Sequence, residues 1–472
     1  MTSISQEECR EFIKNHVFKL EPIKYRQKHP KWPGRVGIEF EMFPIKYQRG
    51  QEALPQPLPL WRTKPNSHCL TDILQKVGQD LGWMPTLDPE TAHITSFQTQ
   101  HQENITFEPG GQIEFSTLPY PCLADAVSRV RTIQSGIQKH FAPLNWHTFQ
   151  MGITPWHSPA EIDLQMQKPR YIAMDKYFKT ISPYGQQMMR QTMTVQICLD
   201  FGNCPTTLAQ RYLASQLLAP FAAATFAHSR YMGCQDTGRD GYRTLVWRHV
   251  DPSRCGFPKL DQIIQQRTRD ACVDAYLDFS LRSQVIYLPQ HQNQTPQPPL
   301  TTSEWLTSGY QGTPPTLTDY QHSLTLLFPE VRPKGFLELR SIDAQSPAWQ
   351  FVPAAYYCGL LYHEPAIQSC LELLIPYAHQ LDKLMERASY GLEDPFMAQI
   401  SKALFQIALE GFTGLPSCFR GAGIEQACLR FYEQFTSQNR TPSSDVKEAV
   451  KAAGRNFPSF DIMQSLDEKW CG

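Results

Sequence analysis

The sequence predicts an α+β fold, in which helices pack behind an open and largely antiparallel sheet. Short segments such as GIEFEMF, GGQIEFS and GFLELRS alternate apolar with polar or acidic residues, which is typical of strands with one buried face. Segments with helical spacing lie between them, and the C-terminal third is mostly helical in pattern. No internal repeat is visible. We therefore expect a single domain over residues 1–472, with insertions near 44–65 and 289–318.

The N-terminal part begins with an amphipathic pattern that predicts a helix over residues 5–19. The first acidic strand follows, and a proline-rich stretch from Pro44 to Pro65 then predicts a long surface loop. The buried face of that first strand is supplied by alternate apolar residues, namely Val36, Ile38, Phe40 and Met42.

The middle of the chain supplies two helices and a further strand. Apolar residues recur at helical spacing from Leu123 to Phe141, and residues 207–226 are rich in Ala, Leu and Gln. Residues 192–201 alternate strictly, which predicts a half-buried strand with Gln196 and Cys198 on its polar face. Pro, Gln and Thr dominate residues 289–318, which we interpret as a loop.

Composition excludes several classes of partner. The 472 residues carry 44 Lys and Arg against 45 Asp and Glu, so no overall field favours nucleic acid or a membrane surface. The 13 cysteines are odd in number and form no CxxC pair, which favours reduced thiols over a disulfide framework. The N-terminus has no apolar stretch of signal-peptide or membrane length. We expect a soluble, cytoplasmic protein.

Acidic residues recur on the polar faces of three predicted strands. Glu39 and Glu41 share one strand, Glu114 lies on a second, and Glu338 precedes Arg340 on a third. Residues two apart on a strand point the same way about 7 Å apart, and neighbouring strands lie about 4.8 Å apart. Two carboxylates 4 Å apart repel by about 4 kcal/mol at an effective dielectric near 20, so such a cluster needs cations. Oxygen ligands favour Mg²⁺ or Mn²⁺, and Mg²⁺ commonly brings substrate phosphates, which indicates a nucleotide.

An ordinary structural interpretation competes for each residue alone. A single glutamate on a strand is more often an exposed residue that pairs with Lys or Arg. The strand glutamates taken together are better explained as a binding site. FEPGGQIEF adds Glu108 and a Gly110–Gly111 turn, which allows the backbone to approach a ligand closely. The scattered histidines and the thiols of Cys198 and Cys255 are more simply structural.

A series of motifs resembles the plant-type glutamate–cysteine ligases, and within them the actinobacterial enzymes associated with ergothioneine synthesis. The resemblance runs in order from about residue 34 to about residue 435. Its motifs are GIEFEMF, FEPGGQIEFS, PRYIAMDKYF, MTVQICLDF, DPSRCG and PPTLTDYQHSLTLLFPEVRPKGFLELRSIDAQ.

The resemblance implies one catalytic domain with the open-sheet fold of glutamine synthetase. It implies that ATP and Mg²⁺ are used to join the glutamate γ-carboxylate to the cysteine amine through a γ-glutamyl phosphate. Arg340 matches the residue that contacts the transferring phosphate, and Gln196 a polar position near the metals or glutamate. The positions matching the acidic metal ligands are Glu39, Glu41, Glu108, Glu114 and Glu338.

Other positions are less closely matched. Arg243 and Trp247 precede DPSRCG and are candidate substrate or nucleotide contacts, although a surface arginine and a core tryptophan explain them equally well. Gln191 occupies the slot of a family arginine, and Arg190, displaced by one residue, would point to the opposite face of a strand. Cys198 replaces a usual asparagine.

Two alternatives therefore stay open. One is a ligase of the same chemistry with a different amine acceptor, which is suggested by the departures from the family pattern at Gln191 and Cys198. The other is a non-catalytic relative that binds metal and nucleotide. The expected ligands in the leading interpretation are glutamate, cysteine and ATP, and the oligomeric state is left open.

Overall fold

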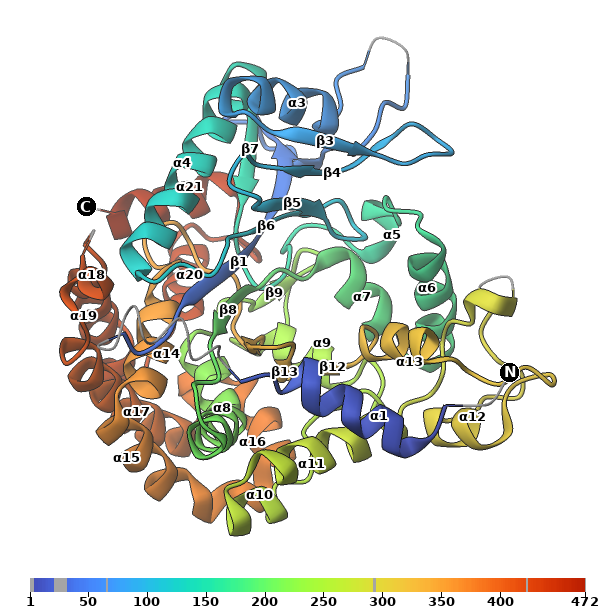
Figure 1. Ribbon diagram of the computed structural model, residues 1–472. Helices are drawn as coiled ribbons and strands as arrows, with labels where there is room; N and C mark the ends of the chain where they lie inside the picture. The colour runs from blue at the N-terminus through green and yellow to red at the C-terminus, as the bar shows by residue number, and fades with distance from the viewer. Residues whose placement is uncertain (1–3, 21–31, 65–66, 292–293, 422, 472) are drawn as a thin grey trace.

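A ten-stranded sheet organises the chain, and β1 (Val36–Lys46) runs diagonally through it (Figure 1). The structure is a computed structural model and describes residues 4–20, 32–64, 67–291, 294–421 and 423–471. Eight strands follow the order β13-β14-β8-β1-β6-β5-β4-β3, while β2 and β7 pair with the far end of β1. The remaining bounds are β2 Gln56–Pro57, β3 Met84–Leu87, β4 Ile94–Gln98, β5 Asn104–Phe107, β6 Ile113–Ser116, β7 Trp146–Phe149, β8 Val195–Leu199, β13 Val331–Pro333 and β14 Leu337–Leu339.

Every pairing in this large sheet is antiparallel, as the sequence predicted. β1 is long enough to pair twice, because residues 36–42 lie between β6 and β8 whereas residues 43–46 pair with β2 and β7. Two small pairs lie outside it: β9 (Tyr231–Met232) with β10 (Gln235–Asp236), and β11 (Cys255–Gly256) with β12 (Phe328–Pro329).

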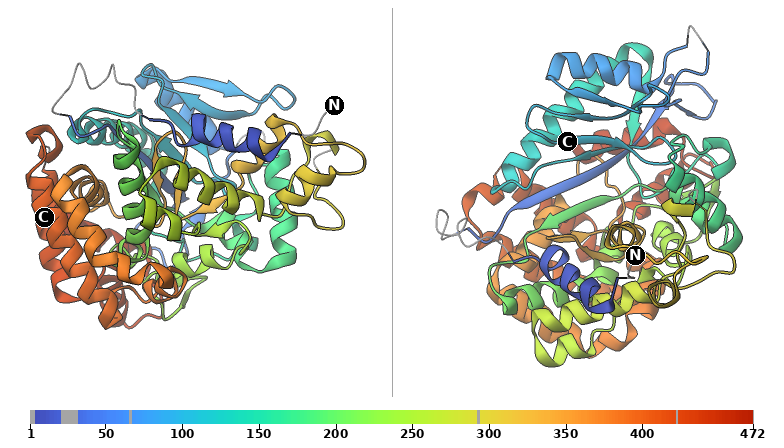
Figure 2. Two further views of the ribbon diagram at one scale, coloured as in Figure 1. Left: turned by 60° about the horizontal axis from the view of Figure 1, so that its bottom comes forward. Right: turned by 45° about the vertical axis from the view of Figure 1, so that its right-hand side comes forward.

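Helices pack behind the sheet and fill the C-terminal third, which is orange to red in Figures 1 and 2. α4 contacts β1 and β7, α14 contacts β8, and α8 contacts β13 and β14. The helices are α1 Gln6–Phe12, α3 Leu70–Leu81, α4 Leu123–Phe141, α5 Pro159–Ile162, α6 Pro169–Ile181, α7 Tyr184–Gln191, α8 Pro205–Thr225, α9 Tyr242–Arg248, α10 Asp261–Gln266, α11 Arg269–Leu281, α12 Thr302–Ser308, α13 Leu317–Leu324, α14 Val352–Tyr362, α15 Glu364–Leu374, α16 Leu381–Ala388, α17 Pro395–Thr413, α18 Ser417–Arg420, α19 Ile424–Gln434, α20 Pro442–Ala452 and α21 Phe460–Cys471.

Local sequence signals explain several of these boundaries. Ser5 and Glu8 form a capping box that starts α1, and a π-helical turn, Ile13–Val17, continues it. The predicted N-terminal helix is therefore confirmed. The helix predicted from Leu123 to Phe141 matches α4 in full, and α8 covers the helix predicted over 207–226.

The two predicted loops contain more structure than expected. β1 continues through Pro44 to Lys46, and β2 adds a short strand within the proline-rich stretch, because this end of β1 is paired on both sides. Residues 302–308 of the second loop form α12, which is capped by a Thr301–Glu304 capping box. Residues 65–66 and 292–293 of these segments lie outside the described part.

Parts of the polar sheet face are more buried than expected, although Glu39, Glu114 and Cys198 on it stay partly exposed. Thr194 and Gln196, on the polar side of β8, are 2% and 3% exposed, and Glu338 of β14 is completely buried. The basic side chains of Arg332, Lys334 and Arg340 line this face, as described below. Behind the sheet, one continuous core cluster joins its apolar face to the C-terminal helices. No helix in the part of the chain that the structure describes is long and apolar enough to span a membrane.

Candidate active site

Three carboxylates meet on one face of the sheet where β1 and β6 pair. Glu39 and Glu41 are two residues apart on β1, and Glu114 of β6 lies opposite Glu41 in the register. Directly opposed residues of an antiparallel pair point to the same face, with Cβ atoms about 5 Å apart. The intervening Ile38 and Phe40 are buried in the core behind the sheet. Strand alternation therefore brings these acids together, as the sequence predicted.

β8 and β14 extend the same face on the other side of β1. Gln196 is the register partner of Glu39, and Glu338 is the partner of Cys198. Because Gln196 and Cys198 are two residues apart on one strand, they share a face. Cys198 Sγ lies 3.9 Å from Glu39 Oε1. We call Glu39, Glu41, Glu108, Glu114, Gln196 and Glu338 together the acidic face.

Glu108 reaches the acidic face from the turn before β6. The Gly111 N–H donates to the Glu108 carbonyl at 2.8 Å, and Gly111 adopts a φ of 88°, a conformation that glycine tolerates best. A Cβ on Gly110 would lie 2.3 Å from a backbone carbonyl of α7. The glycine pair therefore permits both the turn and its close packing. Glu108 is the strongest charged neighbour acting on Glu41.

The carboxyl groups around β1 hold protons more tightly than free glutamate does. Burial is the main cause and neighbouring carboxylates add to it, so the pKa of Glu39 rises to about 8 and that of Glu114 to about 7. Burial followed by repulsion from Glu108 and Glu114 raises the pKa of Glu41, and burial raises the pKa of Glu108. The ionised forms of these four groups would therefore be stabilised by added cations.

Glu338 has the opposite environment. Burial favours its neutral form, but Arg332, Arg340 and Lys334 outweigh burial and lower its pKa well below the usual range. Lys334 Nζ lies 3.2 Å from Glu338 Oε1, and Arg340 Nη1 lies 3.1 Å from Oε2. Arg332 Nε also donates to Oε2. Protein cations already neutralise this carboxylate.

The acidic face has donors that fit Mg²⁺ or Mn²⁺, although the ligand positions stay predictions. As the side chains stand, the described residues contain no group of three or more His, Cys, Asp or Glu placed to hold one ion. Carboxylate and amide oxygens are nevertheless the ligands these ions prefer. Mg²⁺ is usually held by one or two carboxylates, with water and phosphate as its other ligands, so it needs no closed protein cage.

Arg340 lies on the acidic face, as its spacing from Glu338 predicted. Its Nη1 donates to Gln196 Oε1 at 2.7 Å and to Glu338 Oε2 at 3.1 Å. The guanidinium carbon lies 5.5 Å from the centre of the Trp247 ring. Arg340 therefore places a positive charge at the β8–β14 side of the acidic face.

Arg243 and Trp247 of α9 lie next to Arg340. Arg243 is 3% exposed, so the alternative of a surface arginine is wrong. Its Nη2 donates to the Arg340 carbonyl at 3.1 Å, and its guanidinium carbon also lies 5.5 Å from the Trp247 ring centre. The half-buried Trp247 therefore lies near two guanidinium groups, which is consistent with a contact role for both α9 residues.

The region around Gln191 differs from expectation. Arg190 and Gln191 end α7, whereas the strand begins at Val195, so the strand argument for the direction of Arg190 does not apply. Arg190 Nη2 donates to Asp175 Oδ1 at 2.6 Å, and Gln191 Nε2 donates to the backbone carbonyl of His157. Both side chains are thus engaged within the α5–α7 region.

Sequence reasoning missed the basic residues that neutralise Glu338. β13 and β14 form a hairpin in which Arg332 is the register partner of Glu338, and Gly335 in the turn has a φ of 79°. The segment VRPKGFLELR, with glycine between two short alternating runs, contained this signal. Arg170 at the start of α6 was also missed, and it is the cation that most lowers the pKa of Glu108 against the dominant effect of burial.

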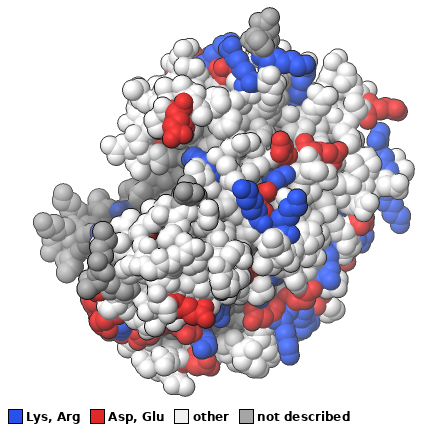
Figure 3. All heavy atoms as spheres, turned by 90° about the vertical axis from the view of Figure 1, so that its right-hand side faces the viewer, with Lys and Arg blue, Asp and Glu red and all other residues white. Residues whose placement is uncertain are grey.

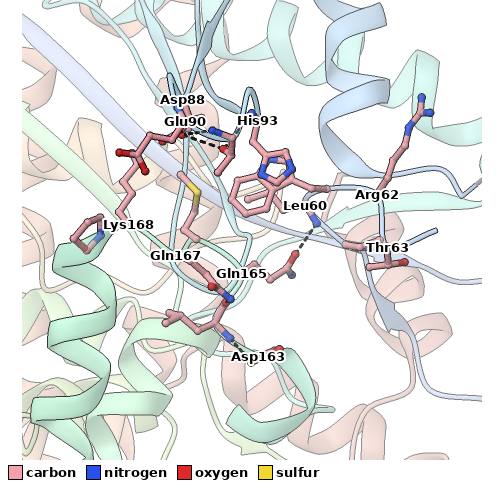
Figure 4. Close-up of a pocket in the computed structure, with 17 residues that line it drawn as sticks. Leu60, Arg62, Thr63, Asp88, Glu90, His93, Asp163, Gln165, Gln167 and Lys168 are labelled. Carbon is pink, nitrogen blue, oxygen red and sulfur yellow. Dashed lines mark hydrogen bonds between the residues drawn. The ribbon is translucent and has the colours of Figure 1, made fainter. Parts of the chain in front are cut away.

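A second hollow borders the turn that carries Glu108 (Figure 4). It has a volume of about 550 Å³, a size typical of small-molecule sites, and is lined by residues 59–63, the β3–β4 tip and residues 163–169. Gln165 links it to the turn, because its Oε1 accepts from the Leu60 N–H at 2.6 Å and its Nε2 donates to the Gly110 carbonyl at 3.0 Å. On the face shown in Figure 3, basic side chains gather around a hollow with acidic atoms between them.

Comparison with known proteins gives the family. Residues 35–390 match the model of glutamate-cysteine ligase family 2. The chloroplastic glutamate–cysteine ligase of Medicago truncatula is 25% identical over 395 residues, covering 80% of this chain and 71% of that protein. Glutamate–cysteine ligase B of Oryza sativa subsp. japonica is 24% identical over 401 residues, covering 81% and 74%.

The crystal structure of a glutamate–cysteine ligase from Francisella tularensis in complex with AMP has a similar fold. The TM-score is 0.50 at 12% identity, and the match covers 93% of this chain and 89% of that chain. This likeness concerns the fold alone. The match to the family over three quarters of the sequence is decisive: the chain belongs to glutamate-cysteine ligase family 2 and is an ATP-dependent carboxylate–amine ligase.

Proposed function

We propose that the protein joins the γ-carboxylate of glutamate to the amine of cysteine, converting ATP to ADP and phosphate and giving γ-glutamylcysteine. The observation that carries the proposal is the strand register, which sets Glu39, Glu41 and Glu114 on one face with Arg340 at its edge. Family membership supplies the reaction class. The geometry supplies the charges that the reaction needs.

The chemistry has two steps. A γ-carboxylate oxygen of glutamate attacks the terminal phosphorus of ATP, the bond to the bridging oxygen breaks, and ADP leaves. The amine of cysteine then attacks the acyl carbon, phosphate leaves, and the amine loses a proton. The first step brings two anions together, so catalysis here depends mainly on positioning and electrostatic neutralisation.

Each residue of the acidic face has a place in this scheme. Mg²⁺ supplies charge neutralisation at the phosphates when bound. The residues that would hold it are Glu39, Glu41, Glu108 and Glu114, whose pKa values rise without cations. Glu338 is the fifth ligand expected from the resemblance. It also contacts Arg340, which we assign to the charge on the transferring phosphate.

Three further residues are assigned to substrate. Gln196 lies between Glu39 and Arg340, so it can contact either the phosphate or the γ-carboxylate of glutamate. Arg243 and Trp247 lie beside Arg340, on the α9 side, and suit a charged amino acid.

The acceptor amine is tested by measuring ADP release with glutamate and a panel of amines. We expect cysteine to give the fastest turnover. Equal turnover with other amines would favour the ligase with a different acceptor. Cys198, which lies near Glu39 and replaces a usual asparagine, is the reason for considering that alternative. Calorimetry that detects no Mg²⁺-dependent ATP binding would instead favour a non-catalytic relative.

The cellular setting is a further part of the proposal. The resemblance to the ergothioneine-associated enzymes predicts a cytoplasmic protein whose product feeds the synthesis of a small thiol. Thiol analysis of a deletion strain checks this prediction: loss of ergothioneine with unchanged glutathione supports it, and the reverse result contradicts it.

A further inference from the structure

A buried aspartate that follows Arg340 in the chain has no role in the scheme above. Asp343 lies just beyond β14 and is 1% exposed, and its Oδ1 lies 3.8 Å from Nη1 of Arg243 on α9. Burial lowers the pKa of Arg243, and Asp343 is the carboxylate that most opposes this effect. The charge on Arg243 is therefore balanced by a residue that is not part of the acidic face.

The other oxygen of Asp343 is held by two donors. Oδ2 accepts from the His228 backbone N–H at 2.8 Å and from the Ser229 hydroxyl at 2.7 Å. The Ser229 hydroxyl oxygen in turn accepts from the Arg243 backbone N–H at 3.0 Å. Gly152 leaves space for the carboxylate, because a Cβ there would lie 2.3 Å from Asp343 Cγ. The carboxylate is therefore held with Oδ1 toward Arg243.

Arg243 contacts both ends of the short segment from Arg340 to Asp343. Its Nη2 donates to the Arg340 carbonyl at 3.1 Å, while its Nη1 lies beside Asp343. The Thr194 hydroxyl lies 3.4 Å from the same carbonyl, and Thr194 forms an isolated antiparallel bridge with Asp343. The main chain is thus fixed at the residue whose guanidinium lies on the acidic face.

Stability does not explain why this ion pair is buried. Moving two charges out of water costs about as much as their attraction returns, so a buried ion pair stabilises a fold no better than apolar side chains of the same size. A buried pair with fixed hydrogen bonds can instead set geometry. Electrostatic catalysis needs such geometry, because a charge must be aimed at the place where opposite charge develops. Through the Arg340 carbonyl, this pair reaches the residue to which the scheme gives that task.

We propose that Asp343 is a positioning residue, which holds Arg243 and, through the Arg340 carbonyl, sets the place of the Arg340 guanidinium. This inference rests on the role that the proposed function gives to Arg340. Because Asp343 is buried, it acts only through its neighbours. Loss of its charge should therefore impair turnover while the residues that bind ATP are kept.

The experiment is a double-mutant cycle on the full-length protein, measured by steady-state ADP release. Asp343→Asn keeps the shape of the side chain and removes its charge. We expect kcat to fall about 10- to 100-fold, the cost of a small misplacement of a catalytic group, with the KM for ATP near the wild-type value. In the Arg340→Gln background the same change should alter kcat by no more than about twofold, because the group that Asp343 positions is already lost. An effect on substrate contact through Arg243 alone would persist in that background.

The matched control is Asp240→Asn. Asp240 is equally buried, and its ion-pair partner is Arg230, whose Nη1 lies 2.8 Å from Asp240 Oδ1. We expect this variant to lose thermal stability as Asp343→Asn does, and to keep a kcat near that of the wild type. Glu372→Gln, at an exposed position of α15, should behave as the wild type in both respects.

The inference is overturned if Asp343→Asn keeps the wild-type kcat, if Asp240→Asn loses kcat equally, or if the effects of Asp343→Asn and Arg340→Gln multiply as those of independent changes do. If Arg340→Gln itself keeps the wild-type kcat, the role proposed for Arg340 fails and the inference fails with it. Far-UV circular dichroism checks folding.

A milder variant keeps the test decisive if Asp343→Asn does not fold. Ser229→Ala removes one donor to the Asp343 carboxylate and should lower kcat by about 2- to 10-fold, as for loss of one hydrogen bond. This loss should again be absent in the Arg340→Gln background, and its persistence there would overturn the inference.

Discussion

The two halves of the acidic face neutralise their charge in opposite ways. Around β1 and β6, Glu39 and Glu114 lie close to other carboxylates, and their pKa values rise to about 8 and about 7. At β14, Glu338 is more deeply buried, yet Arg332, Arg340 and Lys334 outweigh the effect of burial and lower its pKa. The same residue type on the same sheet face thus prefers a proton at one end and is ionised at the other.

This difference indicates which part of the face is built to accept cations from outside. The β14 end already contains its own positive charges, so it is suited to orient Arg340 and to meet an anion. The β1–β6 end has an excess of carboxylates, whose repulsion is relieved only by protons or added cations. A triphosphate with Mg²⁺ could therefore lie across the two ends, with opposite charges supplied at each.

The largest expected effect comes from removing a carboxylate at the β1–β6 end. Glu41→Gln should lower kcat/KM by about 100-fold or more, because a position proposed to hold Mg²⁺ is lost. Steady-state ADP release across a Mg²⁺ titration measures the change, and Glu372→Gln serves as the control. Unaltered turnover and Mg²⁺ dependence would place the cation elsewhere.

Arg340→Gln should have the next largest effect on turnover. Loss of a positive charge aimed at developing negative charge typically costs about 100- to 1,000-fold in kcat. We expect kcat to fall while the calorimetric affinity for Mg²⁺ stays near that of the wild type, because Arg340 lies at the β14 end. An Arg340→Gln variant that loses Mg²⁺ affinity but keeps kcat would contradict the assignment of cation binding to the β1–β6 end and of phosphate stabilisation to Arg340.

Removing a carboxylate should change the free energy of unfolding in opposite directions at the two ends of the acidic face. Glu338→Gln leaves the mostly buried guanidinium groups of Arg332 and Arg340 without their counter-ion and should destabilise the metal-free protein by about 3 kcal/mol or more. Glu114→Gln removes one of several repelling carboxylates while its amide oxygen can still accept from Thr106, so stability should stay equal or increase. Urea unfolding of both variants in EDTA tests this contrast, and equal losses would contradict it.

The smallest effect is the pH dependence of the metal-free protein. A glutamate ordinarily has a pKa of 4.5, whereas the pKa of Glu39 is about 8 in the fold, so the folded state keeps a proton that the unfolded state loses. The stabilising contribution is therefore complete below pH 4.5 and is lost as pH rises toward 8. Unfolding free energies in EDTA should fall across this window, and less steeply in Glu39→Gln. An unchanged slope in the variant would show that other groups govern the trend.

Much of the acidic face could be predicted because strand alternation is a local property. The apolar residues Ile38, Phe40 and Leu339 fix which side is buried, and Glu39, Glu41 and Glu338 must then point the other way. The helix from Leu123 to Phe141 was equally predictable, since one apolar stripe packs on the sheet. These features need only the sequence of one element.

The parts that depend on tertiary neighbours were not predictable. The complete burial of Glu338 depends on the elements that pack around it, although its basic partners lie in the same hairpin. The end of α7 at Gln191 depends on contacts with the backbone at His157.

The most direct test of the account is proton release when Mg²⁺ and a non-hydrolysable ATP analogue bind at pH 7. Titration calorimetry in buffers of different ionisation enthalpy counts the protons. The account predicts net release, because Glu39 and Glu114 have pKa values of about 8 and about 7 before cations bind, and it predicts loss of that release in a Glu39→Gln, Glu114→Gln double variant. Binding of equal affinity without proton release, in the wild type and in the double variant alike, would contradict the claim that these carboxylates receive the cation.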